Sequence, residues 1–571
     1  MQRSLWEHMT PRVSAVASAA RANPLLAITV IALAVRQLAV CWAIAGGFRA
    51  PPNTILVVLA LAVAAGAPAF AVAARRARVA ALLAVDLLVG ALMIAQLVYF
   101  RQFSDLPTTE HVAYATQGVE AGNALSVLLR PLDPLLCLGG SLAALVVPRL
   151  ARTPPLRRRA VLACVAIGLA VFGAVLATSD MTKRARARRS SLAIRFGPIG
   201  YTLYDAGRFA ALHVRRRLSV PGPAEVASDA AALAARHRAG APAPLRGIAR
   251  GMNVIVVQLE SFQAFTLDAR VGAEPVTPAL HRLARESIRF DAFHAQVSQG
   301  NTSDAELLAQ CSLYPLRTGS VFFGFSANDY RCLPEVLREA GYTTAVFHAN
   351  RANFWNRERI YPAIGVERYH HAKSFQPDQP GGAVSDEAFF AQSLAVLEAL
   401  PQPFQAMLIT LSSHVPFDAP FVPRELDHGA RAGTFVARYL DHVRYTDRAL
   451  GAFVEGLRSS GLLDRSVLIV YGDHHGVGRR NSDIGAVLGL GDDDAPRWFD
   501  TERRVPLFIR VPGGPAGTVV TKTGGQLDLA PTALALLGLD VRDHAFFGQD
   551  LLDGRPGLAI LPNGSAISDD R

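Results

Sequence analysis

Residues 253–260 spell NVIVVQLE, a mostly apolar run that ends in a carboxylate. A short run rich in β-branched residues is typical of a strand buried on both faces of a parallel sheet. Similar runs predict further strands at 343–347, 406–411, 466–471 and 506–511. Helical patterns lie between and after them at 278–286, 333–340, 386–400, 438–459 and 529–537. This alternation predicts an α/β domain with a mainly parallel central sheet.

Polar side chains stand where four of these predicted strands end. They are Glu260, His348, His414 and the pair Asp473 and His474. Ligands of open α/β sheets bind beyond the carboxyl ends of the strands, so these groups are expected to converge. Two carboxylates and an imidazole suit Mn²⁺ or Zn²⁺ better than Mg²⁺. The alternative is that the carboxylates only cap the helices that follow.

A candidate nucleophile lies in residues 299–306, which spell QGNTSDAE. Gly300 permits an unusual turn, and Thr302 or Ser303 would begin a helix starting near Asp304. A helix N-terminus favours an anion, and a hydroxyl beside a metal ion loses its proton more readily. The alternative is a plain N-cap, with Glu306 completing a capping box. From these residues alone both interpretations stay open.

Taken together, the motifs resemble the lipoteichoic acid synthase family, whose members are membrane-bound phosphoglycerol transferases with an alkaline-phosphatase/sulfatase-like domain. The similarity covers nearly all of residues 250–550 in the family's order. The matching stretches are NVIVVQLESFQAF (253–265), GNTSDAE (300–306), SLYPLRTGSVFF (312–323), GYTTAVFHANRANFWNRERIY (341–361), VYGDHHG (470–476), RVPLFI (504–509) and GGQLDLAPTALALLG (524–538).

The resemblance implies a role for each matching residue. Thr302 matches the family's nucleophile, and the implied manganese ligands are Glu260, Thr302, Asp473 and His474. The residues implied to line the phosphoglycerol pocket are His348, Trp355, Arg357 and His414. The fork of donors on an arginine can clamp phosphate oxygens, and histidines can donate hydrogen bonds or carry a proton. Two departures concern the substrate: Asn301 replaces a frequent basic residue, and His475 replaces a frequent aromatic residue.

The implied reaction moves glycerol phosphate from phosphatidylglycerol to an acceptor hydroxyl through a phospho-threonine intermediate. The acceptor is a polyglycerolphosphate chain, a glycolipid or a glucan, and no nucleic-acid partner is expected. A phosphoethanolamine transferase is the nearest alternative. A sulfatase is disfavoured because Cys311, Pro315 and Arg317 have the wrong spacing for a formylglycine motif. A non-enzymatic sensor would need one of the four metal-site residues to be lost, and all are present.

The first third of the chain is predicted to lie in a membrane. The sequence of 571 residues is 51% hydrophobic, which excludes collagen, wholesale disorder and a disulfide-rich miniprotein, and its apolar excess is concentrated there. Five stretches are long enough to span: 24–48, 53–74, 79–100, 125–147 and 160–178. The fourth is the weakest, because Arg130, Pro131, Asp133 and Pro134 interrupt it. We therefore expect a transmembrane domain (1–178), a linker (179–250), a catalytic domain (251–553) and a tail (554–571).

Arginines in the short loops predict the orientation. Cytoplasmic loops carry the positive excess, which places the N-terminus in the cytoplasm. Five crossings then put the catalytic domain outside the cell membrane, whereas loss of the fourth crossing would invert this. A basic cluster at 183–189 on the outer side is either a solvated run or a lipid-headgroup patch. The loop arginines are Arg3, Arg12, Arg21, Arg75, Arg76, Arg78, Arg149, Arg152, Arg157, Arg158 and Arg159.

Two residue pairs carry separate expectations. Arg36 and Asp86 lie inside predicted spans, where a structural ion pair is favoured over a transport role. Cys311 and Cys332 lie in the outer domain, and a disulfide between them is a hypothesis set against two buried thiols. The remaining cysteines are expected to be apolar filler in the spans: Cys41, Cys137 and Cys164.

Overall fold

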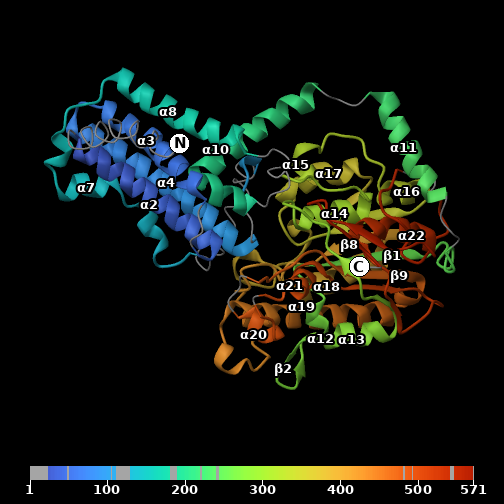
Figure 1. Cartoon of the computed structure of the whole chain (residues 1–571). Coiled ribbons are helices and arrows are strands. Elements are labelled where there is room, and N and C mark those ends of the chain that lie inside the picture. The colour runs from blue at the N-terminus through green and yellow to red at the C-terminus, as the bar shows by residue number, and fades with distance from the viewer. Residues whose placement is uncertain are drawn as a thin grey trace. The chain divides into compact units, whose positions relative to one another are not determined.

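The computed structural model describes residues 23–569 apart from 48–50, 104–105, 111–128, 180–188, 219–221, 239–242, 480–482, 492 and 541–544. The chain forms two compact units, Met1–Ser219 and Val220–Arg571 (Figure 1). The three N-terminal arginines and the basic cluster up to residue 188 lie outside the described residues. The two units are described separately below.

The second unit is built on an eight-stranded sheet in the order β11-β4-β10-β9-β1-β8-β6-β7. Strand β1 (Asn253–Leu259) lies at its centre, parallel to β8 (Phe404–Ile409) and to β9 (Ser466–Gly472). Strands β6 (Thr343–Phe347) and β7 (Arg368–His370) continue the parallel part beyond β8. The predicted parallel core is therefore confirmed.

On the other side of β9, one strand of the sheet as described runs opposite to all the others. Strand β10 (Leu507–Arg510) is antiparallel to β9 and to β4 (Ile288–Phe290), while β11 (Thr518–Val520) is parallel to β4. Leu507 pairs with Tyr471 near the carboxyl end of β9, so the chain re-enters the sheet at the end where β9 leaves it. This register explains why β10 runs back along β9.

Helices cover both faces of this sheet (Figure 1). Successive side chains of β1 alternate between two hydrophobic cores: Val254 and Val256 pack in one, Ile255 and Val257 in the other. The first core includes residues of α14 (Thr302–Cys311), α16 (Leu333–Glu339) and α22 (Leu529–Leu536). The second includes residues of α13 (Pro278–Arg285), α18 (Asp386–Ala399) and α19 (Phe435–Ser459). A strand buried on both faces has the nearly continuous apolar sequence from which it was predicted.

The predicted C-terminal tail is instead part of this unit. Strands β13 (Leu558–Ile560) and β14 (Ala566–Ser568) form a hairpin, and Ala559 is fully buried. The Asp569 carboxylate accepts hydrogen bonds from the backbone N–H groups of Thr523 and Gly557. Only two apolar residues of the hairpin point inward, which is why the polar sequence predicts a loop.

In the first unit, four described helices are long and apolar enough to cross a membrane. Their candidate spans are Pro24–Ala45, Asn53–Ala71, Arg75–Arg101 and Arg158–Ala177. They correspond to α2 (Pro24–Ala45), α3 (Pro52–Gly66) with the 3₁₀ turn η1 (Ala67–Ala71), α4 (Arg75–Phe103) and α8 (Arg158–Ala177). These are the first, second, third and fifth predicted spans.

The fourth predicted span is not a continuous helix. Its described part consists of a 3₁₀ turn, η3 (Asp133–Cys137), and the short helix α7 (Gly140–Val146). Prolines 131 and 134 lack the amide hydrogen that an α-helix needs, and two glycines follow at 139 and 140. A glycine is required at 139, because a Cβ there would lie 2.2 Å from a carboxylate oxygen of Asp86.

This broken segment nevertheless runs antiparallel along α4. Asp133 pairs with Arg101 near the end of α4, and Cys137 packs so closely on Gly90 that a Cβ there would lie 2.6 Å from its sulfur. Further along, Ser141 donates to Asp86, and the carbonyl of Ala151 accepts from Arg78. The stretch of α4 from 78 to 101 is about 34 Å long at about 1.5 Å per residue. The chain from Asp133 to Ala151, which contains the broken segment and the 3₁₀ turn η4 (Leu150–Arg152) after it, thus follows α4 over a length similar to the hydrocarbon thickness of a bilayer.

The expected ion pair between Arg36 and Asp86 forms and supports this break. Their side chains are buried, with 2.7 Å between Nη2 and Oδ1. Arg36 Nη1 also donates to the carbonyl of Leu136, and Asp86 Oδ2 accepts from both the N–H and the hydroxyl of Ser141. The pair satisfies backbone groups that an interrupted helix would leave without partners in lipid.

Part of the predicted linker packs into the first unit instead. Helix α10 (Arg189–Leu218) kinks at Gly197, and before the kink Ala193 and Phe196 are buried against residues of α2 and α3 such as Val40 and Val57. The aromatic and aliphatic residues of this first part therefore belong to the membrane unit. Helix α11 (Pro223–Arg238) is exposed along its described side chains.

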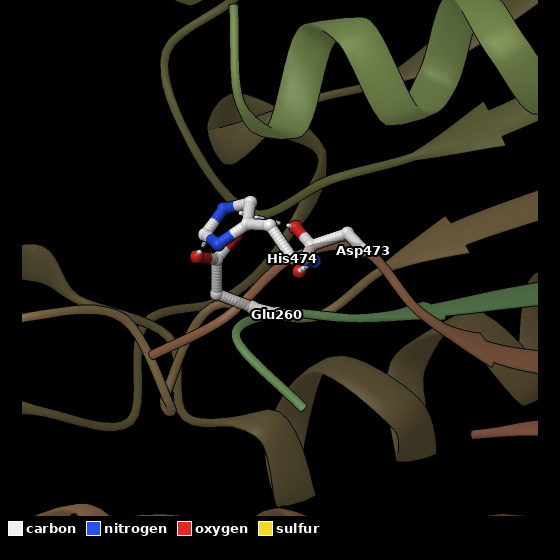
Figure 2. A group of neighbouring side chains, drawn as sticks. All are labelled: Glu260, Asp473 and His474. Carbon is white, nitrogen blue, oxygen red and sulfur yellow. Dashed lines mark hydrogen bonds and ion pairs between the residues drawn. The ribbon is translucent and has the colours of Figure 1, made fainter. Parts of the chain in front are cut away.

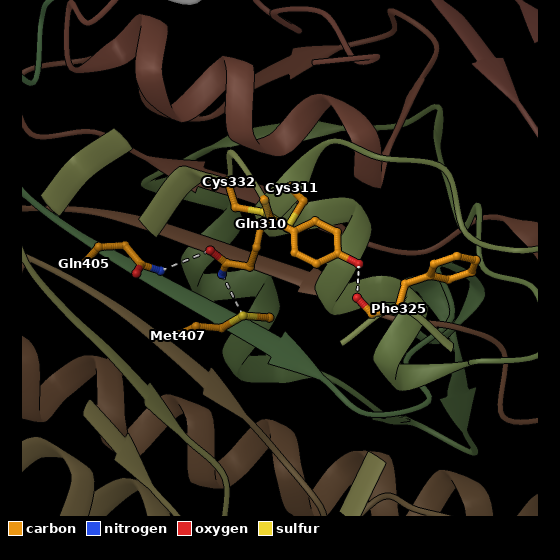
Figure 3. The surroundings of a disulfide bond; sticks show 7 residues. Gln310, Cys311, Phe325, Cys332, Gln405 and Met407 are labelled. Carbon is orange, nitrogen blue, oxygen red and sulfur yellow. Dashed lines mark hydrogen bonds between the residues drawn. A yellow bond between two sulfur atoms is a disulfide. The ribbon is translucent and has the colours of Figure 1, made fainter. Parts of the chain in front are cut away.

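The cysteines behave as two groups. Cys311 and Cys332 form a disulfide that joins the end of α14 to the start of α16 (Figure 3), so the hypothesis of a bridge is supported. Cys41, Cys137 and Cys164 are free.

Candidate active site

The first part of the site consists of side chains at the carboxyl ends of β1 and β9. Glu260 follows β1, and Asp473 and His474 follow β9, so pairing of the two strands brings them together (Figure 2). All three are buried, and their ligand atoms lie within 4.8 Å of one another. His474 Nε2 is 3.4 Å from Glu260 Oε1 and 3.4 Å from Asp473 Oδ2.

The backbone after β1 holds these carboxylates in place. Ser261 has a left-handed conformation with φ of 60°, and its N–H donates to Asp473 Oδ1 at 2.7 Å. Its hydroxyl donates to Glu260 Oε1 at 2.9 Å. The N–H of His474 donates to the same Asp473 oxygen at 2.6 Å. One residue thus orients both carboxylates through two different donors.

The charges of this cluster fit a divalent cation. Asp473 Oδ2 is buried without a hydrogen-bond partner among the described residues. Burial and the neighbouring Glu260 carboxylate raise the pKa of Asp473 well above its ordinary range. Burial also opposes ionisation of Glu260, but the charges of His474 and His414 outweigh it and lower the pKa of Glu260. A cation between the carboxylates would remove this conflict.

The tautomer of His474 agrees with such a site. Its Nδ1 lies 3.1 Å from the carbonyl of His475. A carbonyl can only accept, so Nδ1 carries a hydrogen, and Nε2 is the nitrogen that faces the carboxylates and would offer its lone pair to a cation. Two carboxylate oxygens and one imidazole nitrogen are a donor set that Mn²⁺ or Zn²⁺ accepts.

Thr302 brings a hydroxyl to the same cluster. Its Oγ1 lies 3.2 Å from Glu260 Oε2 and 3.4 Å from His474 Nε2. Helix α14 begins at Thr302, and the N-cap position is Asn301, so the N-cap interpretation of Thr302 is wrong. The other candidate hydroxyl, on Ser303, is bonded to Gly300 and Ser320 instead.

A strained turn presents Thr302 to the cluster. Asn301 has φ of 43° and ψ of −113°, a region that side chains other than glycine rarely occupy. Asp304 fixes the turn, since its Oδ2 accepts the N–H groups of Ser298 and Gly300, each at 2.9 Å. Burial raises the pKa of Asp304 to about 7. A Cβ at Gly300 would lie 2.1 Å from Asp304 Oδ1, so the turn requires a glycine there.

The two remaining histidines flank the cluster. His348 follows β6, is buried, and donates from Nδ1 to the carbonyl of Ile409 at 3.0 Å. Burial and the charges of Arg357 and His414 lower its pKa well below its ordinary value, so it is neutral and its Nε2 is an acceptor. That suits a hydroxyl better than a phosphate oxygen. His414 is exposed, and its charge acts on both Glu260 and His348.

Arg357, which is expected to clamp phosphate oxygens, has an acidic partner inside the protein. Its guanidinium is fully buried and forms an ion pair with Glu306, with 2.6 Å between Nη2 and Oε1. Glu306 therefore does not form the predicted capping box. Trp355, two residues earlier, has a left-handed backbone with φ of 55° and packs on Phe323 and Phe354.

Sequence reasoning missed the buried amides behind the site. Gln258 lies within β1, and its Nε2 donates to the carbonyl of Thr302 at 3.4 Å. Tyr471 of β9 donates its hydroxyl to Gln258 Oε1. Gln526 donates to the carbonyl of Asp473 at 2.6 Å, and Gln263 Oε1 accepts the N–H of Gly476. The available signal was a glutamine in the middle of an otherwise apolar strand, since a buried amide needs partners.

Comparison with known proteins places this geometry in a family. Residues 18–218 match the family described as "Lipoteichoic acid synthase N-terminal domain", and residues 252–539 match the family described as "Sulfatase". "Lipoteichoic acid synthase 2" of Bacillus subtilis (strain 168) is 32% identical over 505 residues, which cover 86% of this chain and 76% of that protein. "Lipoteichoic acid synthase" of Staphylococcus aureus (strain NCTC 8325 / PS 47) is 28% identical and covers 84% of this chain and 76% of that protein.

A solved structure agrees with these matches. The lipoteichoic acid synthase LtaP from Listeria monocytogenes superposes with a TM-score of 0.54 at 30% identity, over 59% of this chain and 86% of that chain. The first unit thus matches the lipoteichoic acid synthase model, and the second unit, which contains the ligand cluster, matches the sulfatase model. The chain belongs to the lipoteichoic acid synthase family.

Proposed function

We propose that this protein transfers glycerol phosphate from phosphatidylglycerol to an acceptor hydroxyl through a covalent ester on Thr302. The observation that carries the proposal is the position of Thr302 Oγ1, which contacts Glu260 at 3.2 Å and His474 at 3.4 Å in the buried cluster. A threonine at the start of a helix, held against a candidate metal site by a strained turn, suits a nucleophile better than a purely structural residue.

The proposed reaction has two steps, in each of which one ester bond to phosphorus forms and another breaks. In the first, the Thr302 hydroxyl gives up its proton as Oγ1 bonds to phosphorus, and the bond from phosphorus to the diacylglycerol oxygen breaks as that oxygen takes up a proton, so neutral diacylglycerol leaves. In the second, the acceptor hydroxyl gives up its proton as its oxygen bonds to phosphorus, and the bond from phosphorus to Thr302 Oγ1 breaks as Oγ1 takes up a proton. The Thr302 hydroxyl already donates toward Glu260 Oε2, so its proton has an acceptor as the first bond forms. The neutral His348 can accept from a hydroxyl of the substrate.

The residues that would hold a metal ion are Glu260, Thr302, Asp473 and His474. A divalent cation there would supply Lewis-acid stabilisation of phosphoryl charge and favour the alkoxide form of Thr302. We propose Mn²⁺, with Mg²⁺ or Zn²⁺ as substitutes, because the set combines carboxylate oxygens with one imidazole.

We further propose that the chain crosses the cell membrane five times and that its catalytic unit lies outside. The chain from Asp133 to Ala151 follows α4 from Arg101 to Arg78, which supports a fourth crossing although it is not a continuous helix. With the N-terminus in the cytoplasm, five crossings place the sulfatase-like unit on the outer side. A disulfide between Cys311 and Cys332 agrees with an oxidising compartment. The site would then lie on the same side of the membrane as phosphatidylglycerol of the outer leaflet.

Turnover of defined lipids by the full-length protein in vesicles tests the donor. With Mn²⁺ present, we expect release of diacylglycerol from phosphatidylglycerol, loss of that release with a chelator, and recovery when Mn²⁺ is added back. Thr302→Ala should insert normally and lose turnover by more than about a thousandfold. Mass spectrometry of the products identifies the acceptor among polyglycerolphosphate, glycolipid and glucan. Turnover of phosphatidylethanolamine in place of phosphatidylglycerol would contradict the proposal and favour a phosphoethanolamine transferase.

A further inference from the structure

Buried hydrogen bonds join α14, the helix that begins at Thr302, to Arg357 at the end of a later loop. Glu306 lies four residues after Thr302 on α14, on the same side of the helix, and is fully buried. Its carboxylate accepts from Arg357 Nε at 3.1 Å and Nη2 at 2.6 Å. The hydroxyl of Tyr361, on α17 (Arg357–Ala363), donates to the same carboxylate at 2.6 Å.

The nitrogens of the buried guanidinium are engaged unequally. Glu306 occupies the edge formed by Nε and Nη2. Nη1 has only a 3.5 Å contact with the carbonyl of Phe354, which is the outer limit of a hydrogen bond. Nη1 is therefore the least engaged nitrogen, and its N–H groups are donors held in a fixed direction, which suits a phosphate oxygen.

The loop before Arg357 needs such an anchor. Trp355 and Asn356 both have left-handed backbone conformations, with φ of 55° and 58°. Non-glycine residues hold this conformation only where surrounding contacts impose it. Asn356 donates to the carbonyl of Phe322 at 2.7 Å, and Arg357 is held by Glu306 immediately afterwards. The two contacts together fix the course of the loop.

We infer that Glu306 is a positioning residue for phosphate recognition: it holds Arg357 so that the weakly engaged Nη1 meets the phosphate at a set distance from Thr302. The inference rests on the proposed function and deepens it. Because Glu306 neutralises Arg357 in the protein interior, the phosphate is recognised by directed N–H donors and not by an unpaired buried cation. Glu306 and Thr302 are on one helix, so the nucleophile and the phosphate-binding group are connected rigidly.

A double-mutant cycle on the full-length protein tests the inference. The variants are Arg357→Lys, Glu306→Gln and their combination, and the readouts are kcat and KM for phosphatidylglycerol with Mn²⁺. Each single substitution should lower kcat/KM about ten- to hundredfold, as expected for loss of a charge-assisted bidentate contact. The kcat/KM of the double variant should be within about threefold of that of the less active single variant, because Glu306 acts only through Arg357.

Two further variants separate positioning from folding. Tyr361→Phe removes one hydrogen bond to Glu306, should fold, and should lower kcat/KM about fivefold in the wild-type but not in the Arg357→Lys background. Asp447→Asn is the matched control: Asp447 is also buried and accepts the N–H groups of Ala279 and Leu280 far from this network in sequence. It should lower thermal stability and leave kcat/KM within about twofold.

Binding of sn-glycerol 3-phosphate in a Thr302→Ala background gives a readout that does not depend on turnover. Glu306→Gln and Arg357→Lys should weaken this binding by similar, non-additive factors. The inference would be overturned if the losses of the two single variants multiplied in the double variant. Unchanged kinetics in Glu306→Gln would overturn it as well. If the wild-type protein does not turn over phosphatidylglycerol, the proposed function fails, while the binding cycle still decides whether Glu306 positions Arg357.

Discussion

At the scale of single residues, the site depends on a turn that only one residue type can form. Gly300 packs against Asp304, and the Asp304 carboxylate accepts the backbone N–H groups of Ser298 and Gly300. The turn forces Asn301 into a strained conformation directly before Thr302. Buried hydrogen bonds stabilise this strained conformation. A larger side chain in the turn should therefore shift Thr302, the proposed nucleophile.

Gly300→Ala should therefore impair both folding and turnover. The added methyl would meet Asp304 Oδ1 at 2.1 Å, and its accommodation should cost about 1–3 kcal/mol of stability. We expect turnover of phosphatidylglycerol to fall at least about tenfold, because Thr302 would move relative to Glu260. Gly324→Ala is the control, since the nearest atom to its Cβ would be 3.9 Å away. Equal activity of the two variants would show that the turn does not position Thr302.

His442 provides a pH-dependent prediction outside the site. Burial lowers the pKa of His442 to about 4, and its Nε2 accepts the N–H of Ala419 at 3.2 Å. The folded protein thus favours the neutral ring. The resulting stabilisation is fully present above pH of about 6.5 and is lost as the pH falls toward 4, by up to roughly 3 kcal/mol.

Thermal melting of the full-length protein between pH 7.5 and pH 5, values chosen to bracket the unfolded-state pKa of about 6.5, measures this effect. The wild type should lose more stability on acidification than His442→Gln, whose amide can still accept from Ala419 but does not titrate. A variant with the same pH dependence as the wild type would show that His442 does not contribute.

At the scale of elements, the regular strands and the irregular membrane segment differ in how far the sequence predicts them. The strands that carry Glu260 and Asp473 are regular, and their positions followed from apolar runs that end in polar residues. The ends of β1 and β9 are adjacent because the strands pair, which the sequence pattern alone does not specify. The fourth membrane segment is irregular, and its backbone is completed by the Arg36–Asp86 pair, a contact between residues 50 positions apart.

Asp86 should therefore be required for the fold of the membrane unit. Asp86→Ala would leave Arg36 buried without a countercharge and Ser141 without an acceptor, at a cost of about 3–5 kcal/mol. Asp86→Asn retains an acceptor and should lose less. The measurement is the yield of monodisperse full-length protein after detergent extraction, followed by its melting temperature. Equal yield and melting temperature for the alanine variant and the wild type would refute a supporting role of this pair.

At the scale of the whole molecule, the sequence was most informative about the sulfatase-like unit. Its central strands and the metal-site residues follow from local patterns, because a doubly covered sheet has a distinct apolar signature and leaves its functional groups at strand ends. The pairing of Glu306 with Arg357, the hairpin after residue 557 and the burial of Phe196 in the membrane unit could not be predicted. Each depends on which distant segment covers a side chain, and that is a property of tertiary packing.

The two units also divide the task proposed for the protein. The membrane unit keeps the chain at the lipid surface, and the sulfatase-like unit carries the residues that would act on a headgroup. Confinement to the same bilayer raises the effective concentration of the donor lipid for the site. The proposed chemistry depends on one oxygen, that of Thr302, which lies beside the cluster of Glu260, Asp473 and His474.

The most direct test of this account is the mass of the peptide that contains Thr302 after reaction. The full-length protein is incubated in vesicles with phosphatidylglycerol and Mn²⁺, without acceptor, and is then denatured with acid and digested. We predict that this peptide gains one glycerophosphoryl group on Thr302, that Thr302→Ala gains none, and that added acceptor removes the group. Rapid turnover of phosphatidylglycerol with no adduct on Thr302, or with the adduct on another residue, would contradict the account.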